Sequence, residues 1–222
     1  MRDAFRSVRH WVFDLDNTLY PPATRLFDQI EERMVAFVMR TLGTSRSEAD
    51  KLRHDYWKAH GTTLAGLMAN HDIDADDFLV DVHDINFDGL SPDPHLADLI
   101  DGLPGRKIVY TNGSAPYAAE VLKARGLDAA FDAIYGVEDA GYTPKPQQAA
   151  FERVFAKDGL DPTAAAMFED DPRNLAAPRA MGMRTILVAP EPTHAPHIEH
   201  HTDDLAGFLR GLPVGRSDAP HG

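Results

Sequence analysis

Short apolar runs alternate with helix-periodic segments along much of the chain. An apolar run between turn signals is typical of a buried strand, whereas apolar residues three and four apart are typical of an amphipathic helix. The apolar runs predict strands at 11–13, 107–110, 133–137, 164–168 and 185–188. The intervening segments predict a helix beginning at 94 and helices at 115–125, 146–157, 172–182 and 203–212. This alternation predicts an α/β fold, a doubly wound parallel sheet covered on both faces.

The segment between residues 23 and 84 has a different pattern, because it contains no convincing strand. Its predicted helices cover 26–42, 46–60, 62–70 and 74–83. Ser45 and Glu48 form a capping-box signal, and Gly43 and Gly61 are placed to end the first and second helices. We therefore expect an all-helical insert, or cap, at 21–89, a core domain formed by 1–20 and 90–213, and a disordered tail at 214–222.

Polar side chains follow three of the predicted strands at the points where these strands end. Asp14 and Asp16 follow the first strand, Thr111 and Asn112 follow the second, and 169–171 follow the fourth. In an open parallel sheet, ligands bind beyond the carboxyl ends of the strands. One polar strand end is common, but three that face the same crevice are hard to explain as turns. The sequence therefore predicts a functional site at this edge.

Asp14 and Asp16 are two residues apart, a spacing that places both carboxylates on the same side of an extended chain. Their repulsion raises the pKa of one carboxyl group unless a cation lies between them. The pair suggests a site for a hard divalent cation, with Asp14 free to attack and Asp16 free to move a proton. From these two residues alone, a strand end with two solvated turn aspartates is an equally good interpretation.

The composition is that of a globular protein. Of the 222 residues, 43% are hydrophobic and 26% are charged. The absence of cysteine excludes disulfides, thiolate zinc sites and a cysteine nucleophile, and it fits a reducing compartment. No apolar run reaches the length of a membrane span, and residues 1–9 lack the apolar region of a signal peptide. We therefore expect a cytoplasmic protein.

The charge of the chain narrows its possible partners. A formal net charge of −13 repels polyanions and disfavours nucleic acid polymers as partners. It does not forbid a small phosphate ligand, because a bound metal and one lysine can invert the local sign. The histidine-rich run at 194–201 suggests zinc, but its prolines predict a solvated loop.

Four short motifs, taken in order, resemble those of the haloacid dehalogenase (HAD) superfamily: Asp14–Leu19, Thr111–Gly113, Lys145–Pro146 and Glu169–Asp171. The first motif is specific by itself, and all four in order are very specific. The resemblance extends from residue 11 to about 209 and implies a Rossmann-like core with a type 1 helical cap. The dehalogenases themselves lack the second aspartate, so the presence of Asp16 implies phosphoryl transfer.

The resemblance also implies a role for each acidic residue of the first and fourth motifs. Asp14 would attack phosphorus to give an aspartyl-phosphate, and Asp16 would protonate the leaving oxygen and later activate water. Mg²⁺ would be held by Asp14, the backbone carbonyl of Asp16 and Asp170. Catalysis would thus require Asp14, Asp16 and the metal together.

The second and third motifs would bind the phosphate. The hydroxyl of Thr111 and the backbone N–H groups of Asn112 and Gly113 would contact its oxygens. Taken alone, Thr111 is an ordinary strand-end residue. Lys145 lies between two prolines, which hold its backbone extended, and it would bridge Asp14 and the phosphate.

Three residues around Asp170 are expected to support it. Glu169, which stands where this motif more often has glycine, would hold a metal-bound water or face Lys145. Asp171 precedes a proline, so it would cap the following helix or make an outer contact with the metal. Asn174 would orient Asp170.

The cap is expected to choose the substrate, because the core motifs contact only phosphate. Segments around Tyr20, His60 and His83 resemble the pyrimidine 5′-nucleotidase branch of the superfamily and imply a nucleoside monophosphate, UMP or CMP. Tyr20, Tyr56, His60 and His83 would contact the nucleotide. In the alternative interpretation, Tyr56 belongs to the core of the cap and His83 caps a helix.

Two other functions remain open at this point. One is a sugar-phosphate phosphatase or a phosphomutase with the same core chemistry. The other is a non-catalytic protein that binds a ligand or a partner. We expect the partner to be a small phosphorylated metabolite, with no nucleic acid polymer and no membrane, and the protein to be a monomer or a homodimer.

Overall fold

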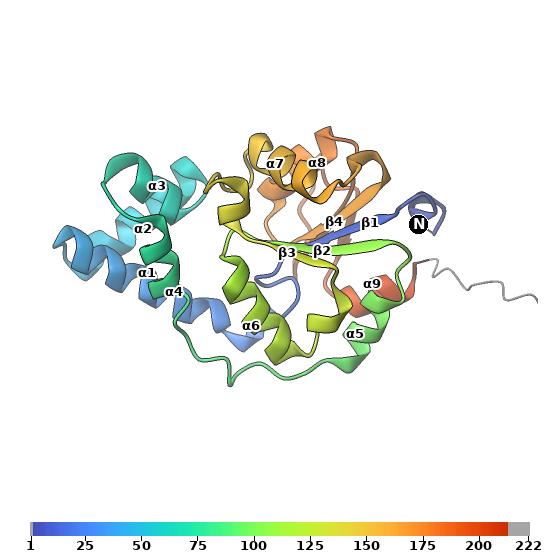
Figure 1. Ribbon diagram of the computed structural model, residues 1–222, viewed down its shortest axis with the longest axis horizontal. Coiled ribbons are helices and arrows are strands. Elements are labelled where there is room, and N and C mark those ends of the chain that lie inside the picture. The colour runs from blue at the N-terminus through green and yellow to red at the C-terminus, as the bar shows by residue number, and fades with distance from the viewer. Residues whose placement is uncertain (1, 213–222) are drawn as a thin grey trace, which may run out of the picture.

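The computed structural model describes residues 2–212, and its centre is a parallel sheet in the order β3-β2-β1-β4-β5-β6. Its strands are β1 His10–Phe13, β2 Arg106–Tyr110, β3 Ala133–Tyr135, β4 Ala165–Glu169, β5 Arg184–Val188 and β6 His200–Thr202. The predicted fold class is confirmed (Figure 1).

Helices cover both faces of the sheet. On one face lie α5 Pro94–Asp101, α6 Ala115–Arg125 and α9 Leu205–Arg210, and on the other lie α7 Gln148–Asp158 and α8 Ala176–Ala180 (Figure 1). Successive residues of β1 serve opposite faces, as the two-residue period of a strand requires. Trp11 and Phe13 pack in the cluster of α5, α6 and α9, whereas Val12 packs with α7 and α8. Because both faces are covered, the chemistry is left to the strand ends.

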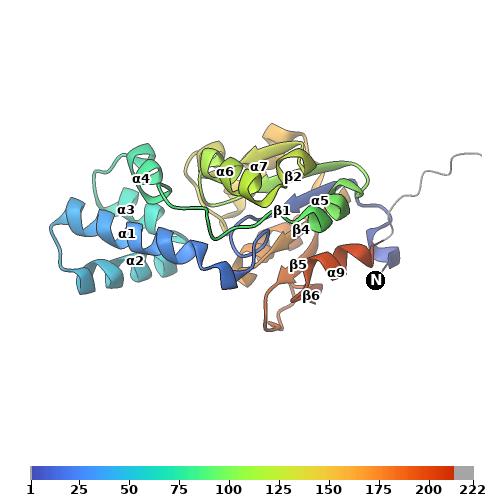
Figure 2. The same cartoon turned by 90° about the horizontal axis from the view of Figure 1, so that it is seen from below.

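Four helices lie beyond the sheet, in the segment where the sequence predicts a cap: α1 Leu26–Leu42, α2 Arg46–His60, α3 Thr63–Asn70 and α4 Ala75–Val82. They pack against one another to one side of the sheet, and the segment between α4 and α5 returns to the core (Figures 1 and 2). The capping box of Ser45 and Glu48 is confirmed. Whether these helices act as a separate domain stays a prediction. None of the helices in residues 2–212 is long and apolar enough to cross a membrane.

The structure corrects the prediction for two helices near the C-terminus. The helix expected at 172–182 divides into a 3₁₀ turn, Pro172–Leu175, and the short α8. The last helix begins at Leu205, with Asp204 as its N-cap. Further 3₁₀ turns are Arg2–Phe5, Pro22–Thr24, Asp128–Ala130, Val137–Ala140 and Pro162–Ala164. The predicted disordered tail, 214–222, lies outside the described residues.

The histidine-rich run is not a loop throughout, because His200–Thr202 forms the edge strand β6 beside β5. Two of its histidines bond to the backbone: His197 Nε2 lies 2.9 Å from the carbonyl oxygen of Pro172, and His201 Nε2 lies 2.7 Å from that of Ala189. Within residues 2–212, no group of three or more potential metal ligands includes a histidine. These contacts give the run a structural role.

Candidate active site

The candidate site lies where the order of the strands reverses. The chain passes from β1 to β2 on one side and reaches β4 on the other side of β1. At such a switch point, the loops that leave neighbouring strands diverge and open a crevice at the carboxyl ends. Asp14 follows β1, Thr111 follows β2, and Asp170 follows β4. The predicted convergence of the strand ends is therefore confirmed.

Lys145 joins two carboxylates at the centre of this crevice. Its Nζ lies 2.6 Å from Asp14 Oδ1, 2.7 Å from Glu169 Oε2 and 3.1 Å from the carbonyl oxygen of Tyr110. These contacts use all three N–H donors of an ammonium group. The side chain is only 1% exposed. Burial alone would lower the pKa of Lys145, but Asp14 and Glu169 offset it and raise that pKa, which keeps the cation charged.

Asp14 carries the strongest sign of a cation site. Burial and, after it, the charge of Glu169 raise the pKa of Asp14, Lys145 opposes them, and the net result is a pKa of about 8. The hydroxyl of Thr18 donates to Asp14 Oδ2 at 3.3 Å. One lysine therefore does not balance the negative charge around this carboxylate.

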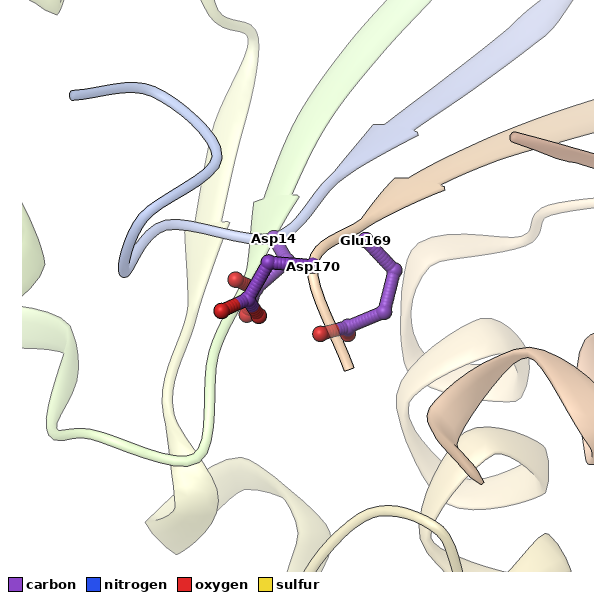
Figure 3. A group of neighbouring side chains, drawn as sticks. All are labelled: Asp14, Glu169 and Asp170. Carbon is purple, nitrogen blue, oxygen red and sulfur yellow. The ribbon is translucent and has the colours of Figure 1, made fainter. Parts of the chain in front are cut away.

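Asp170 shares this surplus of negative charge. Oxygens of Asp14, Glu169 and Asp170 all lie within 4.8 Å of one another (Figure 3). Burial, followed by the charges of Glu169 and Asp14, raises the pKa of Asp170 well above its usual value. Buried carboxylates that repel one another fit a hard divalent cation such as Mg²⁺, which prefers oxygen ligands. The three carboxylates are therefore the candidate ligands for such a cation.

Asp16 lines the same cavity and is held by two tyrosines. The hydroxyl groups of Tyr20 and Tyr117 each donate to Asp16 Oδ1 at 2.7 Å. Burial raises the pKa of Asp16, and the two hydrogen bonds partly counteract this. Tyr20, predicted to contact the substrate, is instead fully buried and lies outside the cavity lining.

The residues predicted to bind phosphate serve partly to position one another. Thr111 is fully buried, and its hydroxyl oxygen accepts the N–H of Gly113 at 2.9 Å. The side chain of Asn112 accepts the backbone N–H of Lys145 at 2.8 Å and donates to its carbonyl at 3.2 Å. Asn112 and Gly113 line the cavity, whereas Thr111 does not. The direct contact of Thr111 with phosphate stays a prediction.

The residues that follow Asp170 differ from expectation at one point. Asp171 caps the 3₁₀ turn through the N–H of Arg173 and also forms an ion pair with that side chain at 2.6 Å. Its predicted N-cap role is confirmed. Asn174 lines the cavity, but it makes no hydrogen bond to Asp170, and its Oδ1 has no partner among the described residues. Asn17 contacts Asp170 instead, donating to Oδ2 at 3.3 Å.

The cavity between the sheet edge and the helices α1–α4 has a volume of about 350 Å³. Its wall on the side of these helices is largely apolar and is lined by Phe27, Ile30, Met34, Leu64, Phe78, Leu79 and Val82. Arg53, Glu31, His54, Trp57 and His83 add polar or aromatic groups to this wall. The cavity therefore joins a charged end to an apolar one.

Of the four residues predicted to contact a nucleotide, only His83 lines the cavity. Its ring stacks on Tyr117 with centroids 4.2 Å apart, its Nδ1 lies 3.1 Å from the hydroxyl of Ser114, and burial lowers its pKa to about 4. Tyr56 and His60 lie outside the lining, and the hydroxyl of Tyr56 is 2.7 Å from His71 Nε2. Ser114 caps α6.

Several residues that the sequence alone did not point to also lie at the site or contact it, among them Asn17, Thr18, Tyr117 and Arg53. Asn17 and Thr18 belong to the first motif, but the sequence assigns them no role beyond completing a turn. Tyr117 and Arg53 lie on helices and gave no local signal, because Tyr117 contacts Asp16 and Arg53 contacts Glu31, both distant in sequence, while the pair of Arg53 with Asp50 on its own helix does not indicate a site. The one signal in the sequence for Asn17 and Thr18 is their position within the first motif, Asp14–Leu19.

Comparison with known proteins identifies the class to which this fold and site belong. Residues 8–182 match the model of the haloacid dehalogenase-like hydrolase family, so the chain belongs to that family. The chain is 28% identical over 192 residues to phosphate metabolism protein 8 of Saccharomyces cerevisiae, an alignment that covers 79% of this chain and 60% of that protein. The chain thus spans less than two thirds of that curated relative.

Two solved structures share the fold. CbbY from Rhodobacter sphaeroides, in complex with phosphate, has a TM-score of 0.66 and 19% identity, with 94% of this chain and 98% of that chain covered. YfnB from Bacillus subtilis, bound to magnesium, has a TM-score of 0.59 and 16% identity, with 91% and 97% covered. At these identities, the likeness concerns the fold.

Proposed function

We propose that this protein is a Mg²⁺-dependent phosphomonoester hydrolase that acts through an aspartyl-phosphate on Asp14. The observation that carries the proposal is the position of Asp14, which is bonded to a buried lysine and shares one cavity with Asp16 and Asp170. Membership of a hydrolase family and the similarity to a phosphate metabolism protein support it.

In the first step, a carboxylate oxygen of Asp14 attacks phosphorus, and the bond from phosphorus to the leaving oxygen breaks. Asp16 gives its proton to that oxygen, so the leaving group departs as an alcohol. In the second step, Asp16 takes a proton from water, and the resulting hydroxide attacks the phosphorus of the aspartyl-phosphate. Inorganic phosphate leaves, and both aspartates return to their starting states.

The other charged groups of the site position Asp14 and offset the negative charge of the phosphate. Lys145 holds Asp14 in place and offers its positive charge to the incoming phosphate. Asp14, Asp170 and the backbone carbonyl of Asp16 would hold Mg²⁺. When bound, the metal shields the anionic nucleophile from the anionic phosphate. The magnesium bound to the related fold of YfnB supports this assignment.

We further propose a pyrimidine nucleoside 5′-monophosphate as the substrate class. A cavity of about 350 Å³ is at the lower end of the roughly 300–1,000 Å³ that small-molecule sites occupy. A pyrimidine has apolar faces and a polar edge with both donors and acceptors. The apolar wall suits the faces, and the ion pair of Arg53 with Glu31, at 2.9 Å, offers both kinds of partner to the edge.

The test is phosphate release from UMP, CMP, AMP and glucose 6-phosphate, with Mg²⁺ and with EDTA, by the wild-type protein and Asp14→Asn. We expect metal-dependent release, with kcat/KM for UMP or CMP at least about tenfold above the others. Turnover should be lost with EDTA and in the variant. Preference for the sugar phosphate would contradict the substrate class alone, whereas no release from any compound would contradict the hydrolase proposal.

A further inference from the structure

Asp16 is the acid and base of the proposed reaction, and its side chain is held asymmetrically. Both tyrosine hydroxyl groups donate to Oδ1, each at 2.7 Å. Within residues 2–212, Oδ2 has no hydrogen-bond partner, although Asp16 lines the cavity. The two oxygens of this carboxyl group therefore have different surroundings.

This asymmetry fixes where a proton can reside. A carboxyl oxygen that accepts two hydrogen bonds has both lone-pair directions occupied, so it is a poor place for a proton. The proton of the neutral acid then resides on Oδ2. The same two bonds also hold the plane of the carboxyl group, since they join it to two buried rings.

Both tyrosines are themselves held in place by burial, and Tyr117 also by a ring contact. Tyr20 directly follows the first motif. Tyr117 lies in the first turn of α6, and Ser114 caps this helix by accepting the backbone N–H of Tyr117 at 3.4 Å. Tyr20 is 1% exposed and Tyr117 is 3% exposed. The ring of His83, at the end of α4, stacks on Tyr117. The ring of Tyr117 is thus held by its own helix and by the ring of His83, while the ring of Tyr20 is held by burial.

We propose that Tyr20 and Tyr117 are positioning residues that bind Oδ1 of Asp16 and direct the proton on Oδ2 toward the leaving oxygen. This inference rests on the proposed function. In the step concerned, the P–O bond breaks, the proton moves from Asp16 Oδ2 to the leaving oxygen, and Asp16 becomes a carboxylate. The tyrosines keep their own protons throughout.

The test uses two substrates that differ in their need for an acid. The leaving group of UMP is the 5′-oxygen of uridine, which departs as a strongly basic alkoxide unless it is protonated. p-Nitrophenyl phosphate instead releases a weakly basic phenolate. Since kcat/KM reports only the steps through the first irreversible one, it includes this proton transfer and excludes the later step in which Asp16 acts as a base. For Tyr20→Phe and Tyr117→Phe, we expect kcat/KM to fall about tenfold with UMP and less than about twofold with p-nitrophenyl phosphate.

The ratio of the two kcat/KM values separates positioning from a general loss of structure, because a smaller folded fraction lowers both alike. Tyr135→Phe is the matched control, since it removes a hydroxyl that bonds to Asp158 at 2.9 Å, away from the cavity lining. Its ratio should equal that of the wild type. Asp16→Asn should show a larger change of ratio than either tyrosine variant, and adding Tyr117→Phe to it should change the ratio no further.

Equal losses on both substrates, or no loss on either, in both tyrosine variants would overturn the positioning role and leave the hydrolase proposal intact. A further change of ratio when Tyr117→Phe is added to Asp16→Asn would also overturn it, because the tyrosine would then act without Asp16. Absence of turnover on both substrates by the wild-type protein would contradict the proposed function and, with it, this inference.

Discussion

The two walls of the cavity are built on opposite principles. On the sheet side, the charged groups are buried and fixed by short hydrogen bonds, as in the contacts of Lys145 with Asp14 and Glu169. On the side of α1–α4, the wall is mainly apolar, and its arginine, Arg53, is paired with acidic residues outside the charged cluster. The contrast suggests that the sheet wall supplies chemistry and the helical wall supplies selection.

The largest effect is expected from removing the buried cation of the sheet wall. Lys145→Met leaves the carboxylates of Asp14 and Glu169 buried without their cation. Removing one partner of a buried ion pair costs about 3–5 kcal/mol, so we expect a loss of that size in the free energy of unfolding. Urea denaturation measures it, and phosphate release should disappear in the same variant.

The control for this change is Lys157→Met, because Lys157 also pairs with one aspartate, at 2.6 Å, but is 58% exposed. Its stability should hardly change, since exposed pairs contribute little. Adding Glu169→Gln to Lys145→Met should restore part of the stability, because one unpaired carboxylate is removed. Equal stability of Lys145→Met and the wild type would mean that the carboxylates take up protons at no cost.

The arrangement of the sheet wall could largely be predicted from the sequence. The carboxyl ends of parallel strands meet at one edge, so Asp14, Asp170 and the Thr111 loop had to lie close together. Their hydrogen bonds could not be predicted in the same way. The contact of Tyr117 with Asp16 depends on how α6 sits against β1, which no local pattern determines.

The helical wall was predicted less well, and the helical period explains why. Tyr56 and His60 were expected at the cavity, but Arg53 and Trp57 lie there. Within each pair the two residues are four positions apart, and the pair of Tyr56 and His60 follows the pair of Arg53 and Trp57 by three positions. The two pairs therefore occupy neighbouring faces of α2. Each face carries polar or aromatic residues, so the pattern does not decide which one faces inward.

The strand β6 was also missed from the sequence. Its pairing with β5 needs only backbone groups, which leave no pattern in the side chains.

A second prediction sharpens the description of the sheet wall as a metal site. Mg²⁺ at about 100 times its Kd should raise the free energy of unfolding of the wild type by about 2.7 kcal/mol, since it binds only the folded state. Asp170→Asn should abolish this gain, because a ligand is lost. Thermal unfolding with Mg²⁺ and with EDTA measures both without relying on turnover.

Asp171→Asn is the matched variant for this experiment. Both oxygens of Asp171 accept hydrogen bonds from Arg173, so we expect Asp171 to cap the turn without contacting the metal. The gain from Mg²⁺ should therefore persist in this variant. If the gain falls as far as in Asp170→Asn, Asp171 belongs to the metal site. If it persists in Asp170→Asn, the assignment of Asp170 is wrong.

The smallest expected effect concerns the helical wall. Arg53→Met removes the guanidinium group that we propose to meet the base, while Lys145 and the carboxylates remain. A hydrogen bond to a charged group contributes about 1.5–3 kcal/mol, so KM for UMP should rise about tenfold or more. The kcat/KM for p-nitrophenyl phosphate, which lacks the polar edge of a pyrimidine, should change less than about twofold.

Arg46→Met separates this effect from the loss of an ion pair between the helices. Both arginines lie on α2 and pair with a glutamate of α1, Arg46 with Glu32 and Arg53 with Glu31, but only Arg53 lines the cavity. Arg46→Met should therefore keep the wild-type KM for UMP. Should both variants raise KM equally, the arginines would act by holding α1 against α2, and selection would have to come from the apolar residues of the wall. If Arg53→Met instead lowers turnover of both substrates alike, a residue of the helical wall contributes to the chemistry. That result would contradict the assignment of chemistry to the sheet wall and of selection to the helical wall.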